Sequence, residues 1–508
     1  MPAKPERDWL EQAQTLMLRR DLARAESLVD DGLRDHPDSF ALRRILAGVR
    51  IQSGREAEGE VLLMQLLAER PEDAGTAFAL ARVLASQSKG AATARVLLTY
   101  FQHALPDTEL AIRAIELLDD CGRKHDAAAI AALALVNASE DLRLHAYAGM
   151  LDAQLGNFPQ ARAHYLRAIN APSACEWHIP LGLALMQRYP NTQHPDFALL
   201  RECLARGDLS AKARSSLLFA LAKAHDDTAE YARAAEYSRE ANALAHVATK
   251  WSRLHWQQEI EIRLNAARIL EKAEPVTNFT PIFVVGLPRS GTTLVAELLA
   301  RFPQVCNRGE SPWLATWAER NALRDQPRRS ALQSAAIAYA THMKRDDAQS
   351  SRWFIDKQPL NLRYIDLIVA LFPNARIVHC RRNARDNVLS LWMQSFSDEV
   401  QGYAYDFSDI ALVMNDCERL MSLWRAKYPD SIHEVSYEHL VASPSRIVAD
   451  LAGQLGFTDH DIDWLSPTTS VDINSASLWQ ARQPIYARSV DRWKNYIQFL
   501  PELFGFPV

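Results

Sequence analysis

A chain of 508 residues is long enough for two or three domains, and 48% of its residues are hydrophobic. Its 57 basic and 62 acidic residues leave no broad positive field, which argues against a nucleic-acid partner. The first nine residues, MPAKPERDW, lack the apolar core of a secretory signal, and the longest apolar run, 127–136, is too short to cross a bilayer. We therefore expect a cytoplasmic protein without a membrane span. The six cysteines form no C-x-x-C pair and the histidines no H-E-x-x-H cluster, so we expect neither a metal site nor disulfides.

The first half of the chain repeats with a period of about 34 residues. Pro37, Pro71 and Pro106 are spaced by 34 and 35 positions, and the segments between them are rich in alanine, leucine and arginine at helical spacing. This is the period of tetratricopeptide repeats, which stack into an α-solenoid because one repeat cannot bury its own apolar face. We predict about six repeats over residues 1–267, irregular near 175–208, followed by a linker over 268–280. Because concave solenoid surfaces bind extended chains, the repeats are expected to recruit a protein or peptide.

Residues 281–299 are predicted to form a buried strand, a tight turn and a helix. Apolar residues fill 282–285, and leucine and valine recur at helical spacing over 294–299. The turn between them directs backbone N–H groups, hydroxyl groups and a helix N-terminus at one place, which suits a phosphate or sulfate group. It is not a Walker A loop, because Thr292 stands where that motif has its lysine.

The turn resembles the 5'-phosphosulfate-binding loop of sulfotransferases, and of protein-tyrosine sulfotransferases in particular. The matching residues are Pro288, Arg289, Ser290, Gly291, Thr292 and Thr293. The resemblance implies a P-loop-like α/β domain with a central parallel sheet over residues 281–508. It also implies 3'-phosphoadenosine 5'-phosphosulfate (PAPS) as the donor and adenosine 3',5'-bisphosphate (PAP) as the product. The whole chain is similar to proteins that join tetratricopeptide repeats to a sulfotransferase domain.

A second anion site is predicted after a strand at 375–380. Arg382 follows this strand, and Ser390 comes eight positions later. Sulfotransferases hold the 3'-phosphate of PAPS with an arginine and a serine at this separation, and a guanidinium with a hydroxyl suits a dianionic phosphate. Two separate anion sites fit PAPS better than ATP. The resemblance further places Tyr437 beside the adenine and Arg488 at the 3'-phosphate.

The same resemblance implies the catalytic residues. Glu310, in a Gly-Glu segment after the first helix of the domain, is expected to be the general base for the acceptor hydroxyl. Lys357, just ahead of a proline, is expected to contact the transferring sulfuryl group together with Arg289. Ser477, with Ser475 as the alternative, is expected to donate to the sulfate oxygens.

The resemblance implies a tyrosine of a protein or peptide as the acceptor. A carbohydrate, lipid or small-molecule hydroxyl stays open as the alternative, with the solenoid used for docking or for a homodimer. A P-loop kinase or a catalytically silent repeat scaffold would keep the same fold. The missing Walker lysine argues against a kinase, and intact Glu310 and Lys357, with Arg382 and Ser390, argue against a silent scaffold. His379 lies inside the second strand and is expected in the core rather than as a base.

Overall fold

The computed structural model describes residues 4–104, 107–265, 270–321, 327–347, 350–396, 399–457 and 485–507. By packing, the chain divides into two compact units, Met1–Leu151 and Asp152–Val508. None of the helices in the described ranges combines the length and the apolar character that a bilayer crossing requires.

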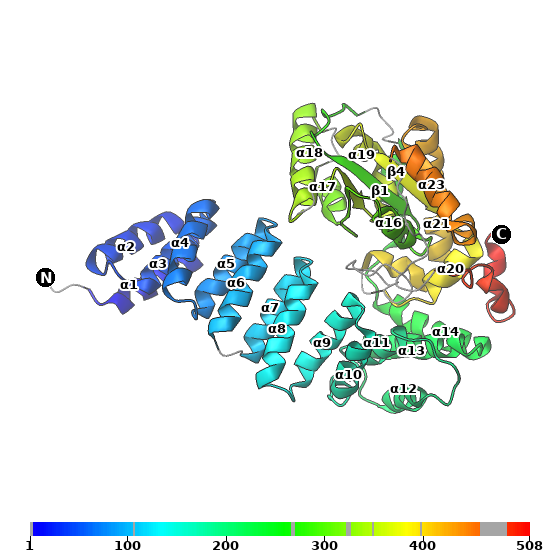
Figure 1. Ribbon diagram of the computed structural model, residues 1–508, viewed down its shortest axis with the longest axis horizontal. Coiled ribbons are helices and arrows are strands. Elements are labelled where there is room, and N and C mark those ends of the chain that lie inside the picture. Colours follow the sequence, from blue (N-terminus) through cyan, green and yellow to red (C-terminus); the bar gives the residue numbers. More distant parts are fainter. Residues whose placement is uncertain are drawn as a thin grey trace. The chain divides into compact units, whose positions relative to one another are not determined.

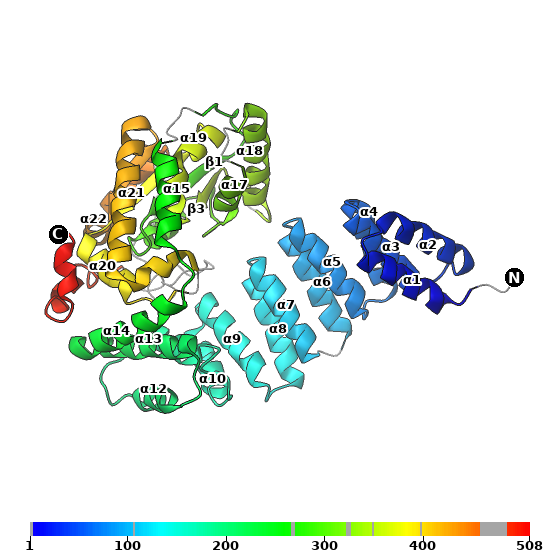
Figure 2. The same ribbon diagram turned by 180° about the vertical axis from the view of Figure 1, so that it is seen from behind.

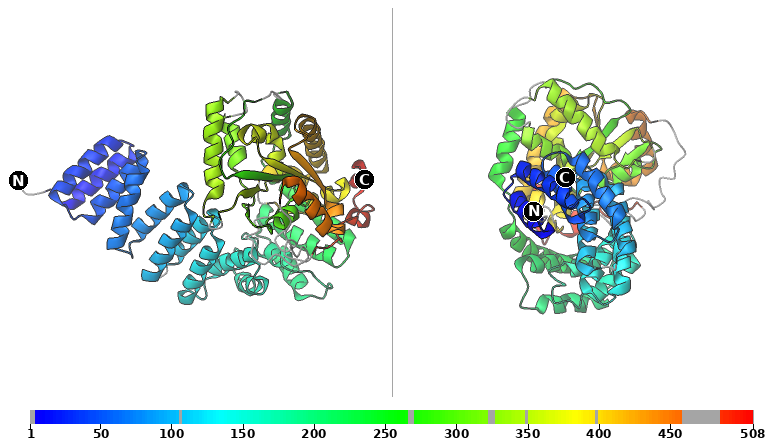
Figure 3. Two further views of the ribbon diagram at one scale, coloured as in Figure 1. Left: turned by 45° about the horizontal axis from the view of Figure 1, so that its top comes forward. Right: turned by 90° about the vertical axis from the view of Figure 1, so that its left-hand side faces the viewer.

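The first unit is built of helical hairpins (Figure 1; Figure 3). Its helices are α1 (Glu6–Leu18), α2 (Leu22–Asp35), α3 (Phe40–Gln52), α4 (Glu56–Glu69), α5 (Ala74–Ser86), α6 (Gly90–His103), α7 (Thr108–Asp120) and α8 (Lys124–Asn137), and α9 (Leu142–Leu155) begins the next hairpin. The first helix of each hairpin begins 34 residues after the previous one, at positions 6, 40, 74, 108 and 142. The predicted α-solenoid of tetratricopeptide type is therefore confirmed.

The repeat boundaries follow from helix capping. The side chain of Ser39 accepts a hydrogen bond from the backbone N–H of Leu42, and Asp73 and Asp107 cap α5 and α7 in the same way. Each of these caps comes one or two residues after one of the predicted proline breakers. A short polar side chain at this position satisfies a backbone donor that the first helical turn leaves open.

The repeats continue into the second unit and become irregular. Its helices are α10 (Phe158–Ala168), α11 (Ile179–Leu185), α12 (Pro195–Ala205), α13 (Ala211–Asp227), α14 (Tyr231–Ala248) and α15 (Arg253–Asn265). The short α11 and α12 lie in the stretch predicted to be irregular. The predicted end of the repeats, near 267, lies outside the described residues, and by packing α10 to α15 belong to the same unit as the sheet.

Helix α15 packs on the α/β domain. Its Trp256 is buried and donates its indole N–H to Asp416 of α21 (Phe407–Lys427) over 3.0 Å, and Figure 2 shows the two helices side by side. Glu259 of the same helix forms an ion pair of 2.7 Å with the buried Arg363. The last helices of the repeat region thus share a core with the C-terminal domain.

In its described residues, the C-terminal domain contains a five-stranded, fully parallel sheet in the order β2-β3-β1-β4-β5. The strands are β1 (Thr280–Gly286), β2 (Val305–Asn307), β3 (Trp353–Asp356), β4 (Arg376–Arg381) and β5 (Ile432–Ser436). The strands predicted at 282–285 and 375–380 are thus β1 and β4, and the expected P-loop-like α/β fold with a central parallel sheet is confirmed.

Helices cover both faces of the sheet, as parallel strands require. One face, with Phe283 and Phe354, packs against α15, α18 (Arg329–Lys344), α19 (Ile365–Leu371), α20 (Ala384–Trp392) and α21. The other, with Val284 and Val378, packs against α16 (Thr292–Leu299), α22 (Tyr437–Ala442) and α23 (Pro444–Leu455). The other elements in the described ranges are α17 (Trp313–Asn321) and the 3-10 helices η1 (Pro359–Tyr364), η2 (Glu399–Tyr405), η3 (Arg492–Asn495) and η4 (Pro501–Gly505).

Candidate active site

Each of the five strands leads into a residue that the sequence predicts to be functional. In sheet order from β2 to β5, these residues are Glu310, Lys357, the loop 288–293, Arg382 and Tyr437. The carboxyl ends of parallel strands lie at one edge of a sheet, which is where α/β domains of this kind bind ligands. The topology therefore brings these separate segments of the sequence to a common edge.

The loop after β1 depends on close backbone approaches. A Cβ atom on Gly286, whose φ is +150°, would lie 2.5 Å from the carbonyl oxygen of Cys380 in β4. A Cβ atom on Gly291, whose φ is +99°, would lie 2.7 Å from the Cδ2 atom of Tyr437. Arg289 between them also has a positive φ, of 69°. Glycine at both positions lets the loop turn tightly between β4 and α22.

Arg289, Arg382, Ser390 and Tyr437 form one group, here called the arginine cluster. Arg289 donates from Nε to the hydroxyl of Ser390 over 3.1 Å, and Arg382 donates from Nη1 to the carbonyl oxygen of Arg289 over 2.9 Å. The guanidinium of Arg382 also lies 4.7 Å from the centre of the Tyr437 ring. The predicted residues of both anion sites are thus in contact with one another.

The electrostatics of the arginine cluster favour an anion. Burial, and then the neighbouring charge of Arg382, lowers the pKa of Arg289 to about 10, and burial also lowers the pKa of Arg382. Moreover, the hydroxyl of Ser290 and the Nε atom of Arg382 are buried and have no hydrogen-bond partner among the described residues. A bound anion would relieve the repulsion of the two guanidinium groups and could accept from these donors.

Glu310 and Lys357 form an ion pair at the other end of the edge, between the segments that follow β2 and β3. The side chain of Lys357 is 5% exposed and that of Glu310 is 32% exposed, so the carboxylate is the more accessible partner. The backbone N–H of Lys357 donates to the carbonyl oxygen of Gly309 over 2.8 Å, which fixes the two segments against each other.

Asp356 is a residue of this edge that the sequence reasoning missed. Its carboxylate is fully buried at the end of β3 and accepts from the hydroxyl of Tyr339 over 2.7 Å and from the backbone N–H of Gln358 over 3.1 Å. Burial raises the pKa of Asp356 to about 7. A charged residue directly after the apolar run Trp353–Ile355, and next to Lys357, was the available signal.

The other predicted residues lie as follows. Arg488 is exposed, with its guanidinium 3.9 Å from the centre of the Tyr486 ring. Ser477 and its alternative Ser475 lie outside the described residues. His379 is buried in β4, where its Nδ1 atom lies 3.2 Å from a carboxylate oxygen of Glu434.

Two residues of α20 support the arginine cluster and were not predicted. Asn387 is buried and donates to the carbonyl oxygen of Pro288 over 3.0 Å, which holds the loop 288–293 against this helix. Asp386 accepts the backbone N–H groups of Asp491 and Trp493, which belong to residues 485–507, here called the C-terminal segment. Both lie between Arg382 and Ser390 in the sequence, within the segment that the predicted pair spans.

Residues 281–461 match the family model described as the sulfotransferase family. These residues form a sulfotransferase-family domain. The chain is 28% identical over 313 residues to an uncharacterized protein of Aquifex aeolicus, covering 56% of this chain and 40% of that protein. It is 24% identical over 242 residues to the protein-tyrosine sulfotransferase of Drosophila melanogaster, covering 42% of this chain and 47% of that protein. The chain thus spans less than half the length of these two relatives.

Among solved structures, the chain is similar to the sulfotransferase domain of the Synechococcus PCC 7002 olefin synthase. The identity is 20%, the TM-score is 0.34, and the match covers 47% of this chain and 98% of that domain.

Proposed function

We propose that this sulfotransferase-family domain transfers a sulfuryl group from PAPS to an acceptor hydroxyl. One observation carries the proposal. In a domain of this family, the two predicted anion-binding segments meet in the arginine cluster. They present buried donors on Ser290 and Arg382 that have no hydrogen-bond partner in the described part of the chain.

The residues present fit the two anionic ends of PAPS. The loop 288–293 would hold the 5'-phosphosulfate, since Ser290 has an open hydroxyl at the start of α16. Arg382 and Ser390 would hold the 3'-phosphate, as the family resemblance implies. Tyr437 would lie beside the adenine, and Arg488 would reach the 3'-phosphate from the C-terminal segment.

The chemistry asked of the protein is proton removal and charge stabilisation. Glu310 would accept the proton of the acceptor hydroxyl as its oxygen bonds to sulfur and the bond between sulfur and the 5'-phosphate oxygen breaks, which releases PAP. Lys357, Arg289 and Ser477 would stabilise the negative charge on the sulfuryl group and on the departing phosphate. The ion pair with Lys357 orients Glu310 before the acceptor arrives.

The acceptor we propose is a tyrosine of a protein or peptide, recruited by the repeats, in the cytoplasm. The similarity to the Drosophila melanogaster protein-tyrosine sulfotransferase supports the tyrosine. The stacked hairpins of the first unit support a polypeptide, because such repeats offer a surface to extended chains. A carbohydrate, lipid or small-molecule hydroxyl is the alternative that an acceptor screen separates.

The decisive experiment is calorimetric titration of the full chain with PAP. We expect tight binding of PAP, weak binding of ADP, and loss of PAP binding in Arg382→Ala. Acceptor peptides with acidic residues around a tyrosine are then compared with sugars in a PAPS assay. A protein that binds neither PAP nor PAPS would refute the proposed function and leave a silent repeat scaffold as the better account.

A further inference from the structure

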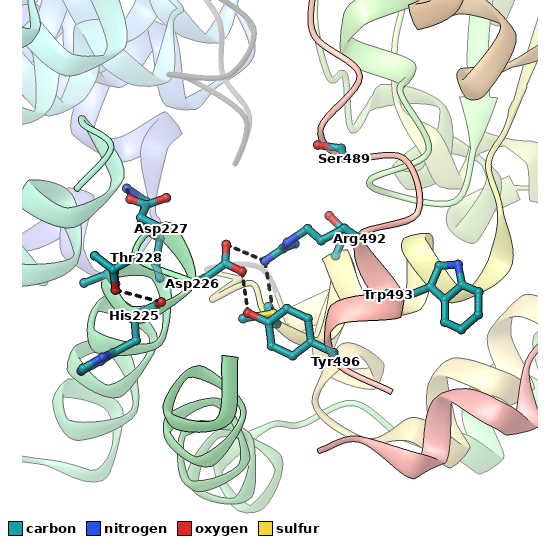
Figure 4. A network of polar contacts seen from close by, with 12 residues as sticks. His225, Asp226, Asp227, Thr228, Ser489, Arg492, Trp493 and Tyr496 are labelled. Atoms are coloured by element: carbon teal, nitrogen blue, oxygen red, sulfur yellow. Dashed lines mark hydrogen bonds and ion pairs between the residues drawn. The ribbon is translucent and has the colours of Figure 1, made fainter. Parts of the chain in front are cut away.

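A polar network joins the last repeat hairpin to the C-terminal segment. At the end of α13, the carboxylate of Asp226 contacts the side chains of both Arg492 and Tyr496 (Figure 4). Arg492 forms an ion pair of 2.9 Å with one of its oxygens, and the hydroxyl of Tyr496 donates to the other. Asp226 and Tyr496 are 270 residues apart in the sequence, so this contact exists only in the folded unit.

The segment held by Asp226 also holds the arginine cluster. The carbonyl oxygen of Ser489 accepts from Nη2 of Arg382 over 2.7 Å. From α20, Asp386 accepts the backbone N–H groups of Asp491 over 2.7 Å and of Trp493 over 2.9 Å. Residues 489–496 are therefore fixed between α13 on one side and α20 on the other.

The charge of Arg492 matters to the same site. Burial opposes its charge, but Asp226 and Tyr496 outweigh burial, so the pKa of Arg492 is raised. Arg492 is also among the charges that lower the pKa of Arg289 and of Arg382, which places it within electrostatic reach of both. Asp226 thus neutralises a third guanidinium beside the arginine cluster.

We propose that Asp226 is a positioning residue for donor binding: by holding Arg492 and Tyr496, it fixes the segment whose Ser489 carbonyl orients Arg382. The inference rests on the proposed function, because it names a determinant of the same donor site. In this view the end of α13 supports the donor site through residues 489–496. An oriented guanidinium loses less conformational freedom on binding a phosphate, so loosening the segment weakens binding.

If Asp226 acted on PAP binding only through its charge, its replacement would have the opposite effect from the one that positioning predicts. Asp226→Asn removes a negative charge and Arg492→Gln removes a positive one. If only the electric field at the site mattered, the first change would tighten binding of an anion and the second would weaken it. If position matters, both changes weaken binding.

The test is calorimetric titration of PAP into the full chain, with thermal unfolding measured on each variant. We expect Asp226→Asn and Arg492→Gln each to weaken PAP binding at least about fivefold, within the usual range for coupled sites. Tyr496→Phe changes no charge and removes one hydroxyl from a buried position, so it should weaken binding by about two- to threefold and remain folded. If Asp226→Asn does not fold, the PAP affinity of Tyr496→Phe tests the inference in its place.

The matched control is Glu502→Gln. It breaks the ion pair of 2.8 Å between Arg239 of α14 and Glu502 of η4. This pair also joins the repeat hairpin to the C-terminal segment, but neither residue forms a hydrogen bond or ion pair with residues 489–496 in the described part of the chain. PAP affinity in this variant should stay within twofold of the wild type. Unchanged affinity in folded Asp226→Asn or Tyr496→Phe, or tighter binding in Asp226→Asn, would overturn the inference while wild-type binding still upheld the function. Failure of the wild type itself to bind PAP would overturn the proposed function instead.

Discussion

The arginine cluster and the Glu310–Lys357 pair share one edge of the sheet but differ in charge balance. The cluster brings two guanidinium groups together, and burial lowers the pKa of each. The pair joins one carboxylate to one ammonium, so its charges compensate. An excess of buried positive charge suits anion binding, whereas a compensated pair suits proton transfer beside a developing charge. Binding and turnover should therefore be separable along the edge.

The largest expected effect is on turnover. Glu310→Gln keeps the shape of the side chain but removes the proposed base, so kcat should fall about 10²- to 10⁴-fold. PAP affinity should stay within about twofold of the wild type. Steady-state kinetics and calorimetry measure the two quantities, with Glu319→Gln on the exposed side of α17 as the control. Equal losses of PAP affinity and of kcat in Glu310→Gln would contradict the division of binding and turnover between the arginine cluster and the Glu310–Lys357 pair.

The next effect is on donor binding. Arg382→Lys keeps a positive charge but has one nitrogen in place of the two fixed nitrogens with which Arg382 reaches the carbonyl oxygens of Arg289 and Ser489. We expect PAP affinity to fall about 10- to 100-fold, while the KM for the acceptor stays unchanged.

The neighbouring Arg381→Lys is the matched control for this variant. Arg381 is 52% exposed and lies 3.9–4.0 Å from its acidic partners Glu418 and Glu434. Its replacement should change PAP affinity by less than about twofold, because exposed pairs contribute little. A loss as large as that in Arg382→Lys would mean that the cluster acts only through its overall charge.

A smaller effect is expected from a steric change in the cluster. In Gly291→Ala the new methyl group meets the ring of Tyr437 at 2.7 Å, and the backbone keeps a positive φ that alanine disfavours. We expect a loss of about 1–3 kcal/mol in the free energy of unfolding and weaker PAP binding, with kcat at saturating PAPS little changed.

Gly453→Ala supplies the comparison for Gly291→Ala. It lies in α23, where a Cβ atom meets no described residue within 4 Å, so alanine there should stabilise the protein by about 0.5–1 kcal/mol. Chemical denaturation measures both. If Gly291→Ala were as stable as the wild type, the close approach of Tyr437 to the loop would not exist in solution.

The smallest effect concerns pH and the end of β3. Burial raises the pKa of Asp356 to about 7 from its ordinary value of 3.8, so the folded protein binds a proton there that the unfolded chain has lost. The free energy of unfolding should therefore fall as the pH rises from about 4 through about 7. Asp356→Asn should flatten this part of the profile. Tyr339→Phe should extend it to higher pH, since the hydroxyl of Tyr339 stabilises the carboxylate. A profile of the same slope in Asp356→Asn would assign the proton to another group.

The sequence allowed the main parts of the fold and of the site to be predicted where the signal is local. Proline breakers followed by Ser39, Asp73 and Asp107 mark helix starts within a few residues, and these caps carry the 34-residue period. The strand, turn and helix around the loop 288–293 form one continuous segment, and Arg382 with Ser390 spans only two turns of a helix beyond a strand end. The residues that were missed have no such local signature. Asp226 lies at the end of an ordinary repeat helix. Asp386 lies within a predicted segment, but its hydrogen-bond donors, Asp491 and Trp493, are more than 100 residues away in the sequence.

By itself, the sequence determined the repeat period, the strand–turn–helix unit and the identity of the charged groups, because each depends on residues close together in the chain. Only the tertiary structure decided which of these groups meet. The order of five parallel strands pairs Glu310 with Lys357 and brings Arg382 against Arg289. Packing of α13 against the C-terminal segment brings Asp226 into contact with Arg492, beside the arginine cluster. Contacts between distant segments depend on burial of apolar faces from the whole unit, which no short stretch of sequence encodes.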